Sequence, residues 1–506
     1  MNILFLTMVS GLKNIETSGI YTDLMRKFRD KGNEVYIIYP RERRLGLPTE
    51  VSHKGEVHLL GVKTLNLSKT NLIEKGLGQV MLERQFKSAL EKHFGKVKFD
   101  VILYSTPPIT FTKVIRYVKR RNPKAMSYLL LKDIFPQNAV DLGMLTKDGL
   151  KGFLYRSFRE KEKDLYRISD YIGCMSPANV RYVIGHNPEI DPAIVEIAPN
   201  SCDVPSEIPV EYEDTAHIRQ KYGLPANKPI FIYGGNMGKP QGIPFLIECM
   251  EAVCEREDCH FAIVGNGTEY PRLETFMLER KPKSVSLFKH LPKEDYDRLA
   301  KACDVGLIFL DYRFTIPNYP SRLLPYLMEH KPIIAVTDPI CDMGTLAEEN
   351  GYGFYCPSNS IETFVKSIDK MLVSDIRQMG ENGYQFFLDN YTTEHTYETI
   401  MRHTVKVVFA NVNQNVYGEG TSYTSPFYSS RNAVVPSDPV YNEDGSWNRD
   451  FIRNSDRNPL LSATYDRDRE YVTRTFNTIY GEYEFIKDLK LKSTLSYDYT
   501  NTKGVS

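Results

Sequence analysis

An alternation of short apolar runs with amphipathic stretches of helical length constrains this chain most, and it occurs twice. The first series gives six strand candidates, at residues 2–8, 35–39, 101–105, 127–131, 171–175 and 195–197. The second begins at Lys228 and gives five more, at 228–233, 260–264, 285–288, 305–310 and 332–336. Apolar strands separated by helices form a parallel sheet that helices cover on both faces. We therefore predict two doubly wound α/β domains facing a cleft at the carboxyl ends of their strands, where such sheets bind ligands.

Two breaks in composition divide the chain. Residues 199–225 are rich in Pro, Asp and Glu, which suits a linker between the two domains. All 15 Met, all 10 His and all eight Cys lie within residues 1–403, whereas the only Trp is Trp447. The residues after 408 are rich in Asn, Tyr, Ser and Thr instead, so we predict that 409–506 form a separate tail.

The net charge is zero, with 64 basic and 64 acidic residues, which excludes a uniformly basic nucleic-acid-binding protein. The charge is unevenly spread, because residues 1–200 hold 32 Lys and Arg against 21 Asp and Glu. Basic clusters occur at 41–44, 87–98 and 119–121. A basic domain can dock on anionic lipid, and the alternative is that these side chains are simply solvated.

The sequence gives no sign of secretion or of a membrane span. No run reaches the roughly 18 apolar residues of a spanning helix, and the N-terminus is typical of a strand rather than a signal peptide. The eight Cys form no CxxC pair, which favours reduced thiols over a disulfide framework or a zinc site. We expect a cytoplasmic protein, with peripheral association at the inner face of the inner membrane as a further hypothesis.

A glycine-rich turn at 233–242 is the strongest local signal for a ligand. Gly235 and Gly238 let the backbone approach a ligand closely, and the N-terminus of the following helix favours a phosphate. Lys239 would add a positive charge. The alternative is a plain turn between a strand and a helix.

Two further segments of the second domain carry weaker signals. The strand at 260–264 leads into Gly265 and Gly267, which are equally typical of a tight turn. Ser321 and Arg322 are predicted to open a helix, where an Arg can bind a phosphate through two hydrogen bonds. A helix-capping Ser beside a solvated Arg is the alternative.

In the first domain, polar residues follow two strand candidates. The run 105–108 (Ser-Thr-Pro-Pro) ends one of them, and Lys132 and Asp133 end the next. Asp133 would face the cleft, where a carboxylate can bind a sugar hydroxyl or orient a nucleophile. The alternative is that Asp133 caps the helical segment that follows it. No acidic metal triad accompanies Asp133, and we expect neither a metal nor a cofactor.

Taken in order, these residues resemble the family 4 retaining glycosyltransferases, which have the GT-B fold of two Rossmann-like domains. The resemblance covers 1–408 and points to the bacterial branch that builds surface polysaccharides such as lipopolysaccharide and capsule, including L-fucosamine and colanic-acid transferases. Its marks are Ser18-Gly19 and the runs 105–108, 133–136, 199–203, 235–242, 261–267 and 320–326.

The resemblance implies a retaining transfer from a nucleotide-diphosphate sugar, expected to be UDP-linked, to a lipid-linked or saccharide acceptor. It implies an acceptor domain at 1–200, a donor domain at 201–385 and a helix at 386–408 that returns to the first domain. It places catalysis at Lys132 and Asp133 and an acceptor or phosphate loop at Ser18 and Gly19. The donor-binding residues that it implies are Gly235, Asn236, Gly238, Lys239, Gly265, Gly267, Ser321 and Arg322.

The sequence departs from the family at several of these places. The family has Arg and Lys where Asn236 and Gln241 stand, and its pair of glutamates falls on Pro317 and Pro325. Lys132 replaces the His that precedes the family's Asp. Two other functions therefore stay open: a sugar-nucleotide epimerase of the same architecture, and a catalytically degenerate nucleotide-sugar binder.

The tail resembles another family. Residues 471–485 and 489–499 alternate apolar or aromatic with polar side chains around a predicted turn at 486–488, as strands of outer-membrane barrels do. The pattern over 409–506 is similar to the barrel of SusC/RagA-type TonB-linked transporters, of which it would supply a few strands. We expect an accidental chimera without transport function, forming an isolated hairpin or staying disordered. A genuine β module that binds glycan or a partner is the alternative.

Overall fold

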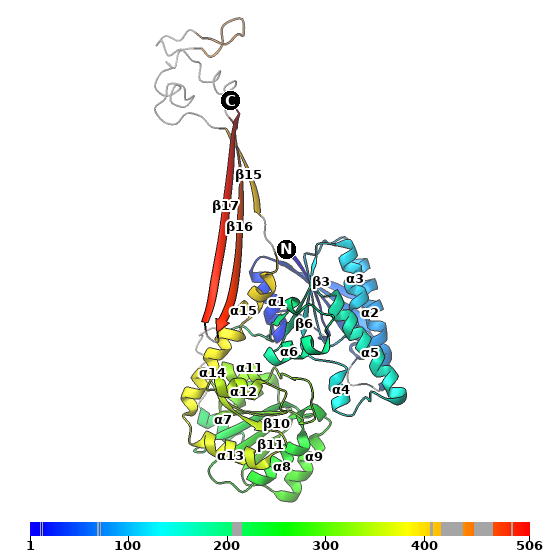
Figure 1. Cartoon of the computed structure of the whole chain (residues 1–506), viewed down its shortest axis with the longest axis vertical. Coiled ribbons are helices and arrows are strands. Elements are labelled where there is room, and N and C mark those ends of the chain that lie inside the picture. The colour runs from blue at the N-terminus through cyan, green and yellow to red at the C-terminus, as the bar shows by residue number, and fades with distance from the viewer. Residues whose placement is uncertain are drawn as a thin grey trace. The chain divides into compact units, whose positions relative to one another are not determined.

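The computed structural model describes residues 1–10, 12, 14–67, 70, 72–204, 215–404, 408–415, 439–449, 469–486 and 489–505. The chain divides into two compact units, Met1–His403 and Thr404–Ser506. The first unit contains two parallel sheets, each covered by helices (Figure 1). The predicted α/β architecture of two Rossmann-like sheets is therefore confirmed.

The first sheet has eight strands in the order β3-β4-β2-β1-β5-β6-β7-β8. All neighbours pair in parallel except β3 and β4, which are antiparallel. Its strands are β1 (Asn2–Leu6), β2 (Glu34–Glu42), β3 (Glu50–Lys54), β4 (Val57–Thr64), β5 (Val101–Ser105), β6 (Met126–Leu131), β7 (Tyr171–Cys174) and β8 (Val195–Ile197). Its helices are α1 (Ile20–Asp30), α2 (Leu72–Phe94), α3 (Thr112–Arg121), α4 (Gln137–Asp141), α5 (Gly149–Ile168) and α6 (Pro177–His186), with short helices η1 (Arg43–Leu45) and η2 (Pro192–Ile194).

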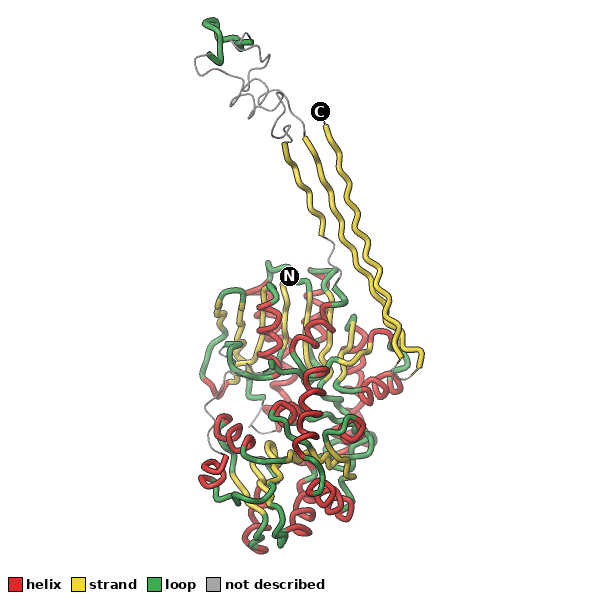
Figure 2. Tube along the Cα trace, turned by 90° about the vertical axis from the view of Figure 1, so that its left-hand side faces the viewer, coloured by secondary structure: helices red, strands yellow, loops and turns green. Residues whose placement is uncertain are grey.

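The second sheet has six parallel strands in the order β11-β10-β9-β12-β13-β14, which is the doubly wound order of a Rossmann fold. Its strands are β9 (Ile230–Asn236), β10 (His260–Asn266), β11 (Val285–Phe288), β12 (Val305–Phe309), β13 (Ile333–Thr337) and β14 (Gly353–Pro357). Its helices are α7 (Thr215–Lys221), η3 (Lys239–Gln241), α8 (Ile243–Val253), α9 (Tyr270–Arg280), α10 (Lys293–Lys301), α11 (Leu323–Met328), α12 (Met343–Glu349) and α13 (Ile361–Leu372). All five residues of β12 and of β13 are buried, as expected for strands that helices cover on both faces (Figure 2).

Three strands of the first unit, β3, β4 and β14, were not predicted. The strands β3 and β4 form an antiparallel hairpin at the edge of the first sheet, and four of the five β3 residues are exposed. The strand β14 is the edge of the second sheet, begins at Gly353 and ends at Pro357. The edge strands β3 and β14 need no continuous apolar run, so the pattern that reveals central strands does not reveal them. The strand β4 lies inside the sheet, between β3 and β2, and His58, Gly61 and Lys63 interrupt its apolar run.

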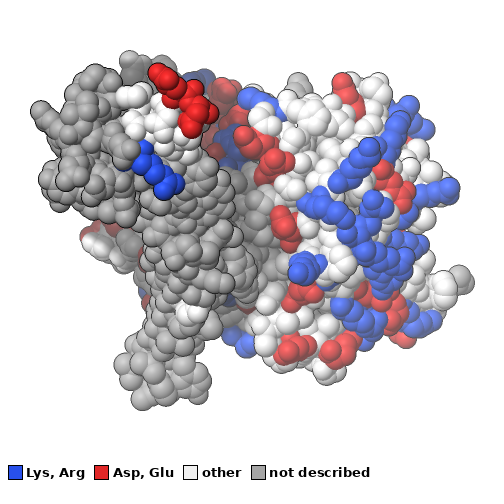
Figure 3. Space-filling model, turned by 90° about the horizontal axis from the view of Figure 1, so that it is seen from above, with Lys and Arg blue, Asp and Glu red and all other residues white. Residues whose placement is uncertain are grey.

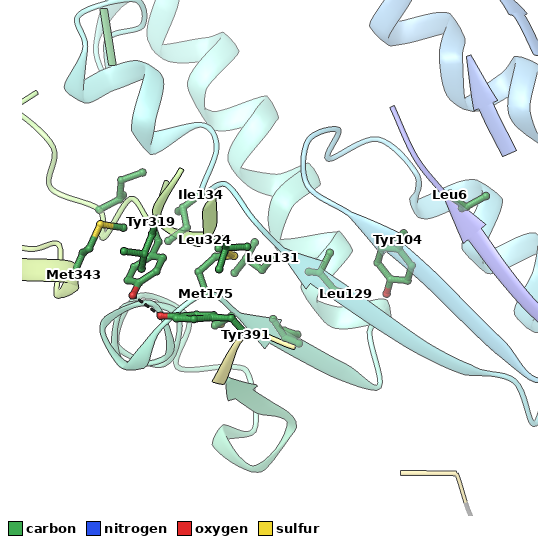
Figure 4. Close-up of a cluster of buried hydrophobic side chains, with 14 of the residues drawn as sticks. Leu6, Tyr104, Leu129, Leu131, Ile134, Met175, Tyr319, Leu324, Met343 and Tyr391 are labelled. Atoms are coloured by element: carbon green, nitrogen blue, oxygen red, sulfur yellow. Dashed lines mark hydrogen bonds between the residues drawn. The ribbon is translucent and has the colours of Figure 1, made fainter. Parts of the chain in front are cut away.

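The two halves of the first unit share one buried cluster (Figure 4). Leu131 and Met175 from the first half pack in this cluster with Leu324 and Met343 from the second. Hydrogen bonds add to this contact, because Asn179 donates to the Pro317 carbonyl at 2.7 Å and the Ala178 N–H donates to Asp342 at 2.7 Å. This shared core joins the two sheets.

Two helices follow the second sheet and lead back to the first. The helix α14 (Ile376–Asn390) ends at Tyr391, whose hydroxyl lies 2.6 Å from that of Tyr319 (Figure 4). The helix α15 (Thr393–Met401) then packs on α1, with Phe28 and Tyr397 in an edge-to-face contact at 5.0 Å. Glu394 also pairs with Lys27 and Lys31 of α1.

The described part of the second unit includes a three-stranded antiparallel sheet in the order β15-β16-β17. Its strands are β15 (Val408–Asn415), β16 (Arg469–Ile486) and β17 (Leu489–Val505). The pairing of β16 with β17 is the predicted hairpin, and both strands extend beyond the predicted ranges. Of the predicted turn, Lys487 and Asp488 lie outside the described residues.

Candidate functional site

A cavity of about 820 Å³ opens between the two sheets at the carboxyl ends of their strands. The first half lines it with Lys132, Asp133, Asn138, Leu142, Met144 and Asn200. The second half lines it with residues at the carboxyl ends of β9 and β10 and in the segments after β9, β11 and β12, including Gly234, Gly235, Gln241, Gly265, His290, Lys293, Tyr296, Ser321 and Arg322. The cavity therefore has two walls, which we name the donor wall (second half) and the acceptor wall (first half) after the roles that the resemblance implies.

Two glycines at the end of β9 make room for the polar side chains of the donor wall. A Cβ atom at Gly234 would overlap the Tyr296 hydroxyl, and a Cβ atom at Gly235 would overlap the Arg322 guanidinium. Gly235 also has φ +128°, a conformation that side-chain-bearing residues rarely adopt. The glycine pair thus places an aromatic hydroxyl and a cation against bare backbone.

Arg322 is the central charge of the donor wall. Its guanidinium lies over the Tyr233 ring, 4.7 Å from the ring centre, and no carboxylate pairs with it among the described residues. Burial by itself lowers the pKa of Arg322, but the neighbouring phenols of Tyr233 and Tyr326 raise it by more, so the pKa lies above its ordinary value. The sequence predicted that Arg322 lies in the first turn of a helix, but the structure makes it the N-cap of α11. The side chain therefore presents a permanent positive charge to the cavity.

Hydrogen bonds within the glycine-rich turn hold the rest of it together. The Gln241 side-chain oxygen accepts hydrogen bonds from the Asn236 side chain and from the Gly238 N–H, both at 3.2 Å. Gln241 lines the cavity, whereas Asn236, Gly238 and the exposed Lys239 do not. The positive charge on this wall thus comes from Arg322 and Lys293, and Lys293 pairs with Asp297 at 2.7 Å.

Gly265 at the end of β10 and Gly267 just after it have different environments. Gly265 lines the cavity, and a Cβ atom there would overlap the Gly235 carbonyl. Gly267 lies outside the cavity lining, and a Cβ atom there would overlap the Met237 backbone. Gly267 thus allows the turns after β9 and β10 to pack closely, and the Met237 N–H donates to the Asn266 carbonyl at 2.9 Å.

The acceptor wall is built on the end of β6. The backbone N–H groups of Lys132 and Asp133 both donate to the Thr106 hydroxyl, at 3.0 and 3.2 Å. Thr106 is buried and belongs to the run 105–108, so this run positions the two candidate catalytic residues. The Lys132 ammonium donates to the Ala198 carbonyl at 3.0 Å.

Burial perturbs both titratable groups of the acceptor wall. It lowers the pKa of Lys132 to about 7 and raises the pKa of Asp133 above its ordinary value. No hydrogen bond to the Asp133 carboxylate is found among the described residues, so both oxygens are open to a ligand. Perturbed groups in a cleft are typical of functional sites.

Ser18 and Gly19 lie outside the cavity lining. Ser18 is exposed, and the Gly19 N–H donates to the Asp23 carboxylate at 2.8 Å. The Gly19 N–H is therefore already hydrogen-bonded, and the acceptor or phosphate loop at Ser18 and Gly19 stays a prediction. Gly11 and Lys13, in the preceding loop, lie outside the described residues.

Comparison with known proteins indicates the enzyme class of the chain. Residues 214–386 match the family of glycosyl transferases group 1. The chain is 26% identical over 341 residues to the probable glycosyltransferase WbjE of Pseudomonas aeruginosa, covering 64% of this chain and 78% of WbjE. The chain is a glycosyltransferase with the GT-B fold. It is also 29% identical over 164 residues to the putative colanic acid biosynthesis glycosyl transferase WcaI of Escherichia coli K12, covering 32% of this chain and 39% of WcaI.

Solved structures share the fold of this glycosyltransferase. Sucrose-phosphate synthase of Thermosynechococcus elongatus matches with a TM-score of 0.60 at 15% identity, over 79% of this chain and 97% of its own. Anabaena HepE in complex with UDP-glucose matches with a TM-score of 0.53 at 15% identity, over 79% and 98%. At this identity the likeness shows the fold alone.

Several residues that line the glycosyltransferase cavity were not predicted as site residues. The side-chain oxygens of Asn138 and Asn200 are buried without a hydrogen-bond partner in the described part of the chain. Asn200 stands in the run 199–203 that carried part of the resemblance, so its motif gave a signal. Tyr296 and His290 gave none, because a single aromatic residue in a helix or loop reads as ordinary packing.

The part of the chain that the structure describes contains neither a metal-binding cluster nor a membrane-spanning helix. No group of three or more His, Cys, Asp or Glu side chains there could hold a metal ion. Among the same residues, no helix combines the length and the apolar character that crossing a bilayer requires.

Proposed function

We propose that this glycosyltransferase moves a sugar from a UDP-sugar to a hydroxyl of a lipid-linked or saccharide acceptor, with retention, in surface polysaccharide synthesis. The observation that carries the proposal is the Arg322 guanidinium, which lies beside Gly235 in the cavity with no carboxylate partner among the described residues. HepE, of the same fold, binds UDP-glucose, and WcaI is named for colanic acid biosynthesis. Both support a UDP-sugar donor and a polysaccharide product.

The donor wall has the chemistry needed to stabilise a departing diphosphate. In the transfer, the bond between the anomeric carbon and the diphosphate oxygen breaks, and the acceptor oxygen bonds to that carbon. Negative charge then grows on the diphosphate, where Arg322, Ser321 and Lys293 would stabilise it. Preorganised donors aimed at a developing anion contribute about 10²–10³-fold in rate each.

The acceptor wall would orient the acceptor. The Asp133 carboxylate would accept a hydrogen bond from the attacking or a neighbouring hydroxyl, and the buried Asn138 and Asn200 oxygens would accept others. Lys132, adjacent to Asp133, would supply positive charge when protonated. The attacking hydroxyl loses its proton as the new bond forms, and the departing diphosphate takes it up.

The experiment is a transfer assay with the full chain, UDP-sugars in turn, and a bacterial lipid extract as acceptor source. We expect UDP release and incorporation of label into the lipid fraction with one UDP-sugar. Conversion of a UDP-sugar to its epimer without acceptor would favour the epimerase instead. Binding of UDP without any turnover would favour a degenerate binder.

For the second unit, we propose that residues 409–506 take no part in transfer. The alternating pattern of the strands β16 and β17 motivated their assignment as a fragment of a SusC/RagA-type barrel, which stays a separate proposal. Deleting residues 405–506 tests the first proposal, because a genuine glycan-binding module would change transfer activity.

A further inference from the structure

A second cavity lies beside the one already described, which is called the first cavity from here on. The second cavity has a volume of about 400 Å³ and lies between the helices α4, α5 and α6 of the first half (Figure 1). Gln137 of α4, Tyr155 and Arg159 of α5 and Tyr182 of α6 line it, and Thr315 is the contribution of the second half. None of these five residues lines the first cavity. A volume of this size is typical of sites for small ligands.

A wall only one element thick separates the two cavities. On α4, Asn138 lines the first cavity and the preceding residue, Gln137, lines the second. In the segment after β12, Phe314 lines the first cavity and the following residue, Thr315, lines the second. Hydrogen bonds fasten the two segments together, because the Asp141 carboxylate accepts from the Thr315 N–H at 2.8 Å and from the Thr315 hydroxyl at 2.9 Å. The two cavities are therefore distinct but adjacent.

The linings of the two cavities also approach each other along the chain between α4 and α5. Met144 lines the first cavity and Lys147 lines the second. Three residues span at most about 11 Å, so the two linings come within that distance of each other. Both side chains are exposed, so the path between them is open to solvent. A chain-like ligand can therefore leave the first cavity beside Met144 and enter the second without crossing the wall.

The charges that line the second cavity are largely balanced. Arg159 pairs with the buried Glu162 at 2.7 Å, and Lys163 pairs with Glu189 at 3.3 Å. Lys147 has no ion pair in the part of the chain that the structure describes. The end of the first half that lies away from α4 is different, because Lys and Arg gather there (Figures 1 and 3). Carboxylates beside the cations of the second cavity repel a phosphate group, which favours a neutral ligand.

The uncharged side chains of the second cavity suit a ligand rich in both C–H and O–H groups. Tyr155 and Tyr182 supply aromatic rings, whose electron-rich faces attract the C–H groups on one side of a sugar ring. Among the described residues, the Gln137 side-chain oxygen accepts a single long hydrogen bond, from the Tyr155 hydroxyl at 3.4 Å. This oxygen and the Lys147 ammonium can therefore bond to ligand hydroxyls as acceptor and donor. Rings beside amide, ammonium and hydroxyl groups match the two kinds of surface of a saccharide.

We infer that the second cavity binds a neutral saccharide segment, apart from the place where the sugar is transferred. The binding itself does not rest on the proposed function, and only its use in transfer does. A saccharide acceptor that extends past Met144 would be held at two sites, which raises its effective concentration at the first cavity. Such an acceptor would have a lower KM than a short one, with the same kcat.

The test is saturation-transfer NMR on the full chain with three neutral trisaccharides as probes: maltotriose, mannotriose and triacetylchitotriose. We expect at least one of them to bind, and inorganic phosphate to leave its binding unchanged. The double variant Tyr155→Leu/Tyr182→Leu is expected to weaken that binding at least about tenfold, because it removes both aromatic rings. The single variant Gln137→Leu is expected to weaken it several-fold.

A matched control lies on α3. Tyr117 is half-buried like Tyr155 and Tyr182 but lines neither cavity, so Tyr117→Leu should leave trisaccharide binding unchanged. Asp133→Asn alters the first cavity and should leave it unchanged as well. The inference fails if no trisaccharide binds, if phosphate displaces it, or if either control weakens binding as much as the double tyrosine variant. UDP binding shows that each variant is folded and reports separately on the proposed function.

Discussion

The donor wall and the acceptor wall of the cavity are built from different chemistry. The donor wall consists of glycines that make room for Tyr296 and for Arg322, a cation that keeps its charge at every physiological pH. The acceptor wall presents Lys132 and Asp133, whose pKa values burial shifts toward neutrality. Binding of a diphosphate needs a fixed charge, whereas handling of a hydroxyl proton needs groups that titrate. The contrast predicts that donor binding is insensitive to pH and that turnover is not.

The largest expected effect is on the donor wall. Arg322→Ala should lower kcat by about 10²–10³-fold, because it removes the unpaired cation that faces the departing diphosphate. It should also abolish UDP binding. Arg313→Ala is the control, since Arg313 lies nine residues earlier and forms an ion pair with Asp311 at 2.7 Å. Equal activity of the wild type and Arg322→Ala in a UDP-release assay would remove Arg322 from the site.

The next effect separates the two walls. Asp133→Asn should lower kcat by about 10²-fold while UDP binding stays unchanged, because the carboxylate acts on the acceptor. In the wild type, burial raises the pKa of Asp133, so kcat/KM should fall as the pH drops through that raised value. The dissociation constant of UDP should stay level over the same range. A pH profile of Asp133→Asn that keeps this acidic limb would contradict the assignment.

A smaller effect concerns stability. The pKa of Lys132 is about 7 in the folded chain and about 10.4 in an unfolded one, so between these values only the unfolded chain holds the proton. The folded state therefore gains stability as pH rises from 7 to about 10 and bears the whole cost of burying the charge below pH 7. Lys132→Met should raise the urea midpoint most below pH 7 and progressively less above it. With exposed Lys289→Met as control, a difference that does not change with pH would show that Lys132 is not desolvated.

The smallest expected effect is from the second unit. A chain that ends at Thr404 keeps every described contact of the cavity and both helices α14 and α15, because the unit boundary follows His403. Its kcat should equal that of the full chain within about twofold, measured in the same UDP-release assay. A loss of ten times that size would assign the second unit a part in transfer.

The sequence predicted most central strands because they follow from a local rule, and a local rule also marks Gly235. A strand buried on both faces must be apolar along its whole length, as in β13, and a turn with φ +128° favours Gly at position 235. The edge strands β3 and β14 were not predicted because an edge strand needs no continuous apolar run, and β4 was not predicted because His58, Gly61 and Lys63 interrupt its apolar run. Ser18 and Gly19 were assigned to an acceptor or phosphate loop from their motif alone. The hydrogen bond from the Gly19 N–H to Asp23 could not be predicted from that motif.

Residues brought together from distant segments were the hardest to predict. Tyr296 reaches Gly234 from α10, and Asn138 reaches the cavity from α4, and neither has a spacing that marks it. The positive charge expected from Lys239 comes instead from Arg322, about 80 residues further along the chain, because η3 leaves the Lys239 side chain outside the cavity lining. Site residues that are brought together by tertiary contacts can be identified from the fold but not from a sequence motif.

The most direct test of the account is thermal unfolding of the full chain, Arg322→Ala and Asp133→Asn, each with UDP, GDP, ADP and CMP in turn. At 100 times its dissociation constant, a bound nucleotide adds about 2.7 kcal/mol to stability, which is several degrees in Tm for a reversible transition. We predict that UDP raises the Tm of the wild type and of Asp133→Asn and leaves that of Arg322→Ala unchanged. If no nucleotide raises the Tm of the wild type, or if UDP raises that of Arg322→Ala equally, the cavity is not the donor site described here.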